Sequence, residues 1–339
     1  MRGIALRVLL AVAVLPVAAL AAGAARDDGA GLTFFGWSDQ HVRTNGEAAH
    51  LGPAIDAMNA LAGTSYPDAI GGKVAPPAFV FGCGDVTEWP THAAVTAYDE
   101  AVTKRLKIPA YDLVGNHDEG GKEPNDALKK WIIGRHGAPS YTFDRGGVHF
   151  VAVFARYNDA LENPAQPVAK EALDFIRKDL AAVPKGRPVV VAMHLCLDAI
   201  TNRDEVVDAF GDANVVLVLG GHYHKATVNE YRGRRFVQLP SPDSEGEFTV
   251  IRITSDRLTA IPYDYKRRKW CDDRKKILDV PIRGPQAAPE SKPATPTPGE
   301  KRGHNTIFRR TVSAVHIPPR PLNRENGIVS PFFSARFVL

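Results

Sequence analysis

Cysteine is scarce in this sequence: there are three in 339 residues, and no two of them have the Cys-x-x-Cys spacing. So few cysteines exclude a disulfide scaffold, and the missing spacing argues against a zinc site built from thiolates. Cys83 and Cys196 each end an apolar run, so we expect both to be buried as small hydrophobic residues. The sequence leaves open whether two of the three cysteines form a disulfide.

Long apolar segments are also rare. Residues 8–22 form one, but its fifteen residues fall short of the ~20 that a helix needs to cross a bilayer. Arg2 and Arg7 precede this run and form a positively charged segment. Small residues with Ala-x-Ala spacing lie at its end and continue as far as Ala24. This arrangement predicts a secretory signal peptide, residues 1–24, that is removed on export. We therefore expect a periplasmic or extracellular protein without stable membrane insertion; the alternative is an uncleaved anchor.

The body of the chain lacks an excess of positive charge. The formal net charge is +4, but residues 1–24 carry +2 and residues 285–339 carry +5, which leaves −3 for residues 25–284. An acidic body argues against a nucleic-acid-binding domain, because such binding depends on neutralising phosphates. Residues 285–303 are rich in proline, alanine, serine and threonine and predict an extended linker. Residues 304–339 predict a disordered basic tail, for which the sequence indicates no function.

Between residues 31 and 284, short β-branched runs alternate with amphipathic stretches. This alternation predicts one layered α/β domain with a largely parallel sheet. The predicted strands are Leu32–Gly36, Ala78–Gly82, Ala110–Val114, Val148–Phe154, Pro188–Met193 and Asn214–Leu219. The predicted helices are Ala54–Ala62, Ala93–Arg105, Asn125–His136, Ala169–Ala181 and Arg203–Phe210. Three later runs resemble strands without intervening helices and predict that the sheet gains some antiparallel members: Phe236–Leu239, Phe248–Ile253 and Leu258–Tyr265.

Five of the predicted strands end in residue types that bind metals. The segments that follow them are Asp39-Gln40-His41, Gly84-Asp85-Val86-Thr87-Glu88, Gly115-Asn116-His117-Asp118, His194 and Gly220-Gly221-His222-Tyr223-His224. The carboxyl ends of parallel strands lie along one edge of a sheet, where ligands and catalytic groups gather. We therefore expect these side chains to converge in one crevice.

Two of these segments carry metal-binding residue types two positions apart. In an extended segment such side chains point to the same face, so Asp39 with His41, and His222 with His224, can reach neighbouring ions. Glycines beside the motifs permit sharp turns and a close approach of the backbone to an ion or phosphate. These glycines are Gly84, Gly115 and Gly221.

The motifs D-x-H, G-D-x-x-[DE], G-N-H-[DE], an isolated His and G-H-x-H occur here in one order, and the chain thereby resembles the calcineurin-like metallophosphoesterase superfamily from about Phe35 to His224. One motif alone is weak, but five in order, each after a predicted strand, are specific. The resemblance implies an α/β/β/α sandwich of two mixed sheets flanked by helices. The compact motifs are similar to the bacterial group that contains class III cyclic-nucleotide phosphodiesterases and general phosphoesterases. Purple acid phosphatases carry Tyr where this chain has Glu88, so that branch is disfavoured.

The resemblance also implies a pair of metal ions bridged by Asp85. The ligands that it implies are Asp39, His41, Asp85 and His224 for one ion, and Asp85, Asn116, His194 and His222 for the other. Oxygen and imidazole ligands suit Fe, Mn, Zn or Ni and leave the identity open. The implied reaction is hydrolysis of a small-molecule phosphomonoester or phosphodiester by direct attack of a metal-bridging hydroxide. His117 would stabilise the phosphoryl oxygens or protonate the leaving oxygen, and Asp118 would orient the His117 ring by accepting its hydrogen bond.

Each of these residues alone has a simpler explanation, because polar residues at strand ends are usually turn formers or caps. Glu88 fits the acidic N-terminus of a helix. Trp37, Trp89 and Tyr223 adjoin the motifs and either line the substrate entrance or pack at the sheet edge. The histidines outside the motifs are expected at the surface or in satisfied interior positions: His50, His92, His136 and His149.

The main functional alternative is a non-catalytic metal-binding scaffold that docks through its tail. A nuclease is disfavoured by the acidic body and by the lack of a basic groove-forming stretch. The sequence specifies neither the substrate nor the metals, and it leaves the oligomeric state unknown.

Overall fold

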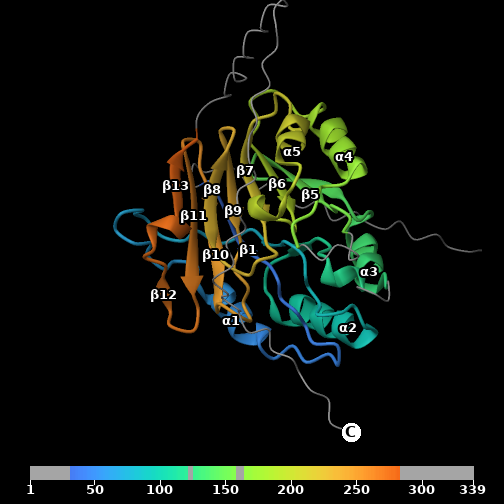
Figure 1. The fold of residues 1–339 in the computed structure, drawn as a ribbon. Coiled ribbons are helices and arrows are strands. Elements are labelled where there is room, and N and C mark those ends of the chain that lie inside the picture. Colours follow the sequence, from blue (N-terminus) through green and yellow to red (C-terminus); the bar gives the residue numbers. More distant parts are fainter. Residues whose placement is uncertain (1–30, 121–124, 158–163, 283–339) are drawn as a thin grey trace, which may run out of the picture. The chain divides into compact units, whose positions relative to one another are not determined.

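The computed structural model describes three stretches of the chain: residues 31–120, 125–157 and 164–282. Within them, two β-sheets lie face to face with helices on their outer sides (Figure 1). The predicted signal peptide 1–24, linker 285–303 and tail 304–339 lie outside the described residues. Among the described helices, none combines the length and the apolar character that crossing a bilayer requires.

The first sheet contains the strands that open the chain and those that close the described part. They are β1 (Leu32–Trp37), β2 (Val80–Gly82), β3 (Ala110–Asp112), β10 (Glu247–Ile253), β11 (Arg257–Asp264), β12 (Lys269–Trp270) and β13 (Leu278–Pro281). Their order is β12-β11-β10-β1-β2-β3, with β13 also paired to β11. Strands β1, β2 and β3 are parallel, whereas β10 runs antiparallel to β1. The carboxyl ends of β1, β2 and β3 therefore share one edge.

The second sheet is built from the middle of the chain. Its strands are β4 (Tyr141–Arg145), β5 (Val148–Val153), β6 (Val189–Met193), β7 (Val215–Gly220), β8 (Thr227–Tyr231) and β9 (Arg234–Gln238). Their order is β4-β5-β6-β7-β9-β8, and the four central strands are parallel. Antiparallel hairpins close both sides, through β4 with β5 and β8 with β9.

Alternation along β5 explains why the two sheets pack against each other. Phe150 belongs to the core between the sheets, and its ring meets Phe34 and Phe79 edge-on at centroid distances of 5.4 and 5.2 Å. Val151 and Val153 point the other way, into a second core beneath the helices. Because successive side chains of a strand face opposite sides, this strand supplies both cores at once. Burying one such phenylalanine contributes about 1.5–3 kcal/mol.

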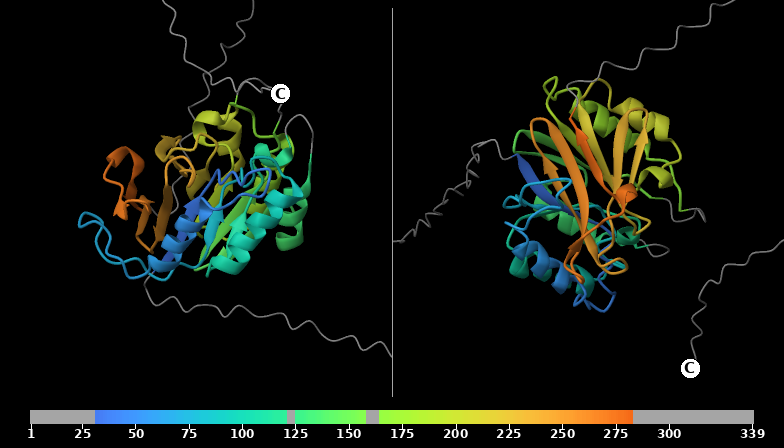
Figure 2. Two further views of the ribbon diagram at one scale, coloured as in Figure 1. Left: turned by 90° about the horizontal axis from the view of Figure 1, so that it is seen from below. Right: turned by 90° about the vertical axis from the view of Figure 1, so that its left-hand side faces the viewer.

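Helices cover the outer face of each sheet (Figure 2). They are α1 (Leu51–Ala60), α2 (His92–Glu100), α3 (Ala127–His136), α4 (Lys170–Leu180) and α5 (Arg203–Ala209), with a wider turn, Ala101–Arg105, that continues α2. Three short 3-10 turns complete the elements: His117–Glu119, Leu197–Ala199 and Arg274–Lys276. Helix α4 buries Leu173, Ile176 and Leu180, the spacing of one helical face. Thr91 caps the N-terminus of helix α2, since its side-chain oxygen accepts the main-chain N–H of Ala94 at 3.1 Å.

This architecture confirms the two-sheet sandwich that the family resemblance implies. It differs from the single, largely parallel sheet that the strand pattern alone predicts. Three of the six predicted strands lie in the first sheet and three in the second, because the hairpin of β4 and β5 starts a new sheet after β3. Alternating strands and helices do not specify which sheet a strand joins, so the division is invisible in that pattern.

Candidate metal centre

The turns after β1 and β2 run side by side and bring the first motif to the second. The main-chain N–H of Asp39 donates to the Gly84 carbonyl at 2.9 Å, and that of His41 donates to the Asp85 carbonyl at 3.0 Å. These bonds continue the parallel pairing of the two strands beyond their ends. As a result, the side chains of both motifs start from neighbouring backbones.

Three side chains form what we call the first ligand group: Asp39, His41 and His224. One ligand atom from each lies within 4.8 Å of the others. His41 Nε2 and His224 Nε2 are 3.1 Å apart, and Asp39 Oδ1 is 3.5 Å from His224 Nε2. Asp39 and His41 are buried, while His224 is partly exposed. The group is thus a candidate cation site that opens to one side.

The second ligand group consists of Asp85, His194 and His222, again with ligand atoms within 4.8 Å of one another. Asp85 Oδ2 lies 3.2 Å from His194 Nε2, and His222 Nδ1 lies 3.3 Å from the same nitrogen. Asn116 adds an amide oxygen, since its Oδ1 is 3.0 Å from both His194 Nε2 and His222 Nδ1. A carboxylate, an amide oxygen and two imidazole nitrogens therefore surround one point.

Asp85 is within reach of both groups. Besides its contact with His194, its Oδ2 lies 4.0 Å from His41 Nε2 in the first ligand group. Its other oxygen, Oδ1, accepts the main-chain N–H of His117 at 2.9 Å. This position is the one expected of a carboxylate shared by two cations.

Main-chain carbonyls orient two of the imidazole rings. His194 Nδ1 lies 2.7 Å from the Cys83 carbonyl, and His222 Nε2 lies 3.1 Å from the Pro164 carbonyl. Because a carbonyl only accepts, each of these nitrogens carries a proton, and in the neutral ring the other nitrogen keeps its lone pair. Histidines that bind metals are usually fixed in this way. Both rings thus present a lone pair to the second ligand group.

The backbone of these motifs is strained. Eight described non-glycine residues have a positive φ, and five of them are candidate ligands with φ between 46° and 77°. These five are Asp39, His41, Asp85, His222 and His224. Left-handed backbone costs about 1–2 kcal/mol per residue, and it persists mainly at functional sites where the surroundings enforce it. The concentration of strain in the ligand groups indicates a functional centre.

The same segment has a family match. Residues 39–226, which include every candidate ligand, match the sequence model of the calcineurin-like phosphoesterases. The chain belongs to the calcineurin-like phosphoesterase family. The fold and the two candidate cation sites agree with this membership.

Several solved structures are similar to the chain at low sequence identity. GAP50, described as the anchor in the inner membrane complex of Plasmodium, has 14% identity and a TM-score of 0.51, over 74% of this chain and 89% of its own. Phosphopantetheinyl hydrolase (PptH) from Mycobacterium tuberculosis has 17% identity and a TM-score of 0.39, over 77% and 99%. A putative 5'-nucleotidase from Staphylococcus aureus has 12% identity and a TM-score of 0.41, over 74% and 54%. No curated protein sequence matches the chain.

Burial and neighbouring charges together set the protonation of the side chains in this calcineurin-like centre. Burial raises the pKa of Asp39 to about 7 and lowers the pKa of His41 and His222 to about 4. Burial also acts to raise the pKa of Asp85, but the adjacent His194 outweighs it and holds that pKa well below its usual range. Burial opposes protonation of His194 too, yet Asp85 prevails and raises the pKa of His194 to about 9. Cations bound here replace protons, so their binding releases them.

His117 lies beside the ligand groups without joining either. Its ring meets the His41 ring edge-on at a centroid distance of 4.9 Å, and its Nδ1 lies 3.0 Å from the Glu88 carbonyl. Since that carbonyl only accepts, Nδ1 donates and Nε2 is the nitrogen left to meet a substrate. The Glu88 side chain does not cap α2; its Oε2 accepts the main-chain N–H of Thr44 at 3.4 Å.

The prediction that Asp118 orients His117 is wrong. The Asp118 carboxylate is buried and accepts the main-chain N–H groups of Val86, Thr87 and Gly115 at 3.1, 2.8 and 2.9 Å. It therefore ties the turn of the second motif to that of the third. The orienting role for His117 falls to the Glu88 carbonyl, a main-chain group without a sequence signature.

Gly115 leaves no room for a side chain beside Asp85. A Cβ at this position would lie 2.2 Å from both the backbone nitrogen and Oδ1 of Asp85. Because backbone cannot move aside as a flexible side chain does, we expect Gly115→Ala to lower the free energy of unfolding by about 1–3 kcal/mol and to reduce bound metal. Urea denaturation and metal analysis measure both effects. Gly134→Ala is the matched control, since nothing lies within 4 Å of its Cβ inside α3 and alanine favours helix; equal stability of the two variants would contradict the clash.

Two of the four histidines outside the motifs are satisfied or exposed as predicted, whereas His50 Nδ1 and His136 Nε2 are buried without a hydrogen-bond partner among the described residues. His149 is buried and contacts Asp144 at 2.7 Å and Asp179 at 2.8 Å. His92 is exposed at the start of α2. None of the four joins either ligand group: His50, His92, His136 and His149.

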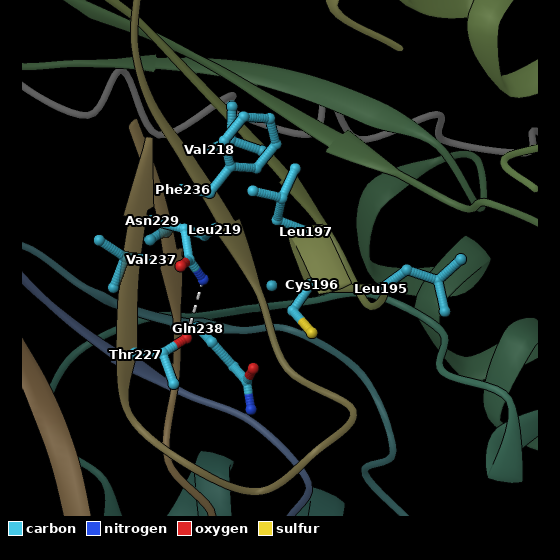
Figure 3. Close-up of a pocket in the computed structure, with 11 residues that line it drawn as sticks. Leu195, Cys196, Leu197, Val218, Leu219, Thr227, Asn229, Phe236, Val237 and Gln238 are labelled. Atoms are coloured by element: carbon cyan, nitrogen blue, oxygen red, sulfur yellow. Dashed lines mark hydrogen bonds between the residues drawn. The ribbon is translucent and has the colours of Figure 1, made fainter. Parts of the chain in front are cut away.

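Behind the turn that follows His194, side chains of β7, β8 and β9 pack around Leu195 and Cys196 (Figure 3). The hollow between them leaves no room for a water molecule. Cys196 and Cys83 are buried and unpaired, as expected of small hydrophobic residues, and Cys271 is also free. This packing supports the loop that carries His194 and offers no ligand site of its own.

Proposed function

We propose that this chain is an exported, dinuclear metal-dependent hydrolase of small phosphomonoesters or phosphodiesters. The proposal is carried by the convergence of the two ligand groups around Asp85. Family membership supports phosphoester chemistry, and the strained backbone of the ligands supports a centre maintained for function.

The donor atoms fit a pair of transition-metal ions. The two groups offer imidazole nitrogens with carboxylate and amide oxygens and no thiolate, a set that suits Fe, Mn, Zn or Ni. When bound, such ions polarise phosphoryl oxygens and supply a strong nucleophile from water at neutral pH.

Beside the metal ligands, the chain supplies a positioned proton donor, His117. His117 is fixed at its main chain by Asp85 Oδ1 and at its ring by the Glu88 carbonyl. In the imidazolium form, Nε2 carries the second ring proton, which it donates to a phosphoryl oxygen or transfers to the leaving oxygen as the ester bond breaks, leaving the ring neutral. Proton transfer from a positioned side chain contributes about 10²–10⁴ in rate.

Export rests on the first 24 residues. Their two arginines, apolar run and small-residue cleavage pattern support secretion with removal of the signal. Mass spectrometry of the protein recovered from the periplasm or medium tests this. A mature N-terminus near residue 25 supports the proposal, and an intact N-terminus in the membrane fraction opposes it.

A scaffold role is the second candidate. GAP50 shares this fold and is described as an anchor, so the fold also serves assembly. His117 favours the enzyme, because a structural metal domain has no use for a non-ligand histidine held beside its ions.

Turnover decides between the two candidates. We expect purified protein supplied with Mn²⁺ to hydrolyse at least one of p-nitrophenyl phosphate, bis(p-nitrophenyl) phosphate and cyclic AMP. Preference for the first indicates a monoesterase, and preference for either of the others a diesterase. Two bound ions per chain without turnover of any of the three would instead support the scaffold.

Metal addition is expected to stabilise the fold. A ligand that binds only the folded state, at 100 times its dissociation constant, adds about 2.7 kcal/mol per site. For a domain of this size we expect Mn²⁺, added after chelation and dialysis, to raise the melting temperature by about 5–10 °C for each site filled. Differential scanning fluorimetry measures the shift, and Ca²⁺ at the same concentration controls for ionic strength. An unchanged melting temperature would argue against ligation by these residues.

A further inference from the structure

Trp89 is an exposed aromatic side chain next to the metal centre. Its exposed fraction is 40%, and in the part of the chain that the structure describes one other large hydrophobic residue, Ile133 at 38%, is exposed to this degree. Ile133 lies on helix α3, whereas Trp89 directly follows the second motif. Ligand sites are lined mainly by hydrophobic and aromatic side chains, so the place of Trp89 beside the metal centre, and not its exposure alone, makes it a candidate ligand contact.

The indole lies against the histidine assigned to the leaving oxygen. The ring centroids of Trp89 and His117 are 4.9 Å apart with an interplanar angle of 31°. A leaving group that accepts a proton from His117 extends away from the phosphorus on this side of the centre. The indole beside His117 is therefore in a position to contact such a leaving group.

The backbone holds Trp89 in this position. On one side, Glu88 donates its main-chain N–H to the Val42 carbonyl at 2.8 Å. On the other, Thr91 donates to the Trp89 carbonyl at 2.8 Å, and its hydroxyl bonds to the Thr44 carbonyl at 2.6 Å. The exposure of the indole is thus not the result of a loose loop.

We propose that Trp89 is a stacking surface for a planar aromatic leaving group, which makes the substrate class phosphoesters of nucleosides or of other aromatic alcohols. This inference rests on the proposed hydrolase function and adds the substrate class to it. The face of an indole is flat and apolar and forms no hydrogen bonds with the edge of a base. It therefore favours aromatic groups in general and not one particular base. Although the ring of Trp89 lies beside His117, 40% of the side chain stays exposed, so part of it is accessible to a ligand.

Steady-state kinetics of Trp89→Leu and Trp89→Phe test the proposal. The substrates are p-nitrophenyl phosphate and adenosine 5'-monophosphate, which carry aromatic groups, and glycerol 1-phosphate, which carries none. We expect Trp89→Leu to lower kcat/KM roughly tenfold for the substrates that stack, the effect of one stacked ring, and to change the glycerol ester less than about twofold. Trp89→Phe keeps a ring and is expected to retain most of the activity. A loss confined to adenosine 5'-monophosphate assigns the surface to nucleosides, and a loss for both assigns it to aromatic groups in general.

Ile133→Ala is the matched control, because it removes the other exposed hydrophobic side chain away from the centre. It is expected to leave all three substrates unchanged. A Trp89→Leu variant that loses activity equally on the three substrates would show that Trp89 only positions His117, and the stacking proposal would be overturned. No loss on any substrate would overturn it as well.

Failure of the hydrolase proposal is recognised separately, as no turnover of any substrate by the unaltered protein with metal. In that event a fluorescence titration decides the stacking proposal by itself. Adenosine 5'-monophosphate is expected to quench tryptophan emission more than ribose 5-phosphate does, and Trp89→Leu is expected to abolish the difference. Equal quenching by the two ligands overturns the inference.

Discussion

Asp85→Asn is expected to remove most of the bound metal and at least about a thousandfold of the activity. The amide keeps the size of the carboxylate and can still accept the N–H of His117, but it loses the charge that both ligand groups share. Metal-assisted stabilisation of the transition state is worth several kcal/mol, and each 1.36 kcal/mol is a factor of ten in rate. Mass spectrometric metal analysis and hydrolysis of the best substrate measure the two losses.

Asp56→Asn is the matched control for this variant. Asp56 also pairs with a cationic side chain, Arg105 at 2.6 Å, but it is exposed on α1, where an ion pair contributes little. We expect its metal content and activity to equal those of the unaltered protein. Two ions per chain and undiminished turnover in Asp85→Asn would refute the shared-carboxylate role.

His117→Ala is expected to keep both ions and to lower kcat by about 10²–10⁴. The reason is that His117 belongs to neither ligand group, yet its ring lies beside His41, and in its imidazolium form the Nε2 proton is available for donation. The loss should be larger for alkyl esters than for p-nitrophenyl esters, because a poor leaving group depends more on protonation. Metal analysis and the kcat values of the two ester types test this.

His92→Ala provides the comparison for His117→Ala. His92 follows the second motif in sequence but is exposed at the first residue of α2, so its loss is expected to change neither metal content nor kcat. Should His117→Ala lose its metals, the residue would be a determinant of the site's structure and not a proton donor. Equal effects on the two ester types would leave charge stabilisation as its role and exclude protonation of the leaving oxygen.

The convergence of the candidate ligands was predictable because it follows from strand direction. Motifs at the carboxyl ends of parallel strands must gather at one edge, and the structure brings Asp39, Asp85 and Asn116 together from β1, β2 and β3. The same argument gathers His194 and His222 from β6 and β7. The packing of the two sheets, through core residues far from the motifs, brings these two edges next to each other.

Contacts with main-chain atoms were not predictable. The Glu88 and Pro164 carbonyls orient His117 and His222, and any residue type supplies a carbonyl. Asp118 was assigned to the wrong partner for a related reason. Its carboxylate is within reach of several N–H donors of the adjoining turns, and the sequence does not rank these against the His117 ring.

The hairpin of β4 and β5 was missed although it has a local signal. Gly146 and Gly147 link the two strands with φ of 55° and 77°, the geometry of the tight turn that a Gly-Gly pair favours. The residues of β4 before this turn, Tyr141–Arg145, alternate between more and less exposed positions as an edge strand does. A search for paired glycines between β-branched runs would have found it, and with it the start of the second sheet.

Each ligand group draws side chains from both sheets, and His41 and His224 in the first are separated by 183 positions. Neither half of the polypeptide, made alone or cut from the other, possesses a coordination site. Contacts this distant in sequence form late and slowly during folding, after the loop entropy between them has been overcome. Cation uptake therefore reports that the two sheets have come together, because neither ligand group is complete before His222 and His224, after β7, have joined the ligands that follow β1 and β2.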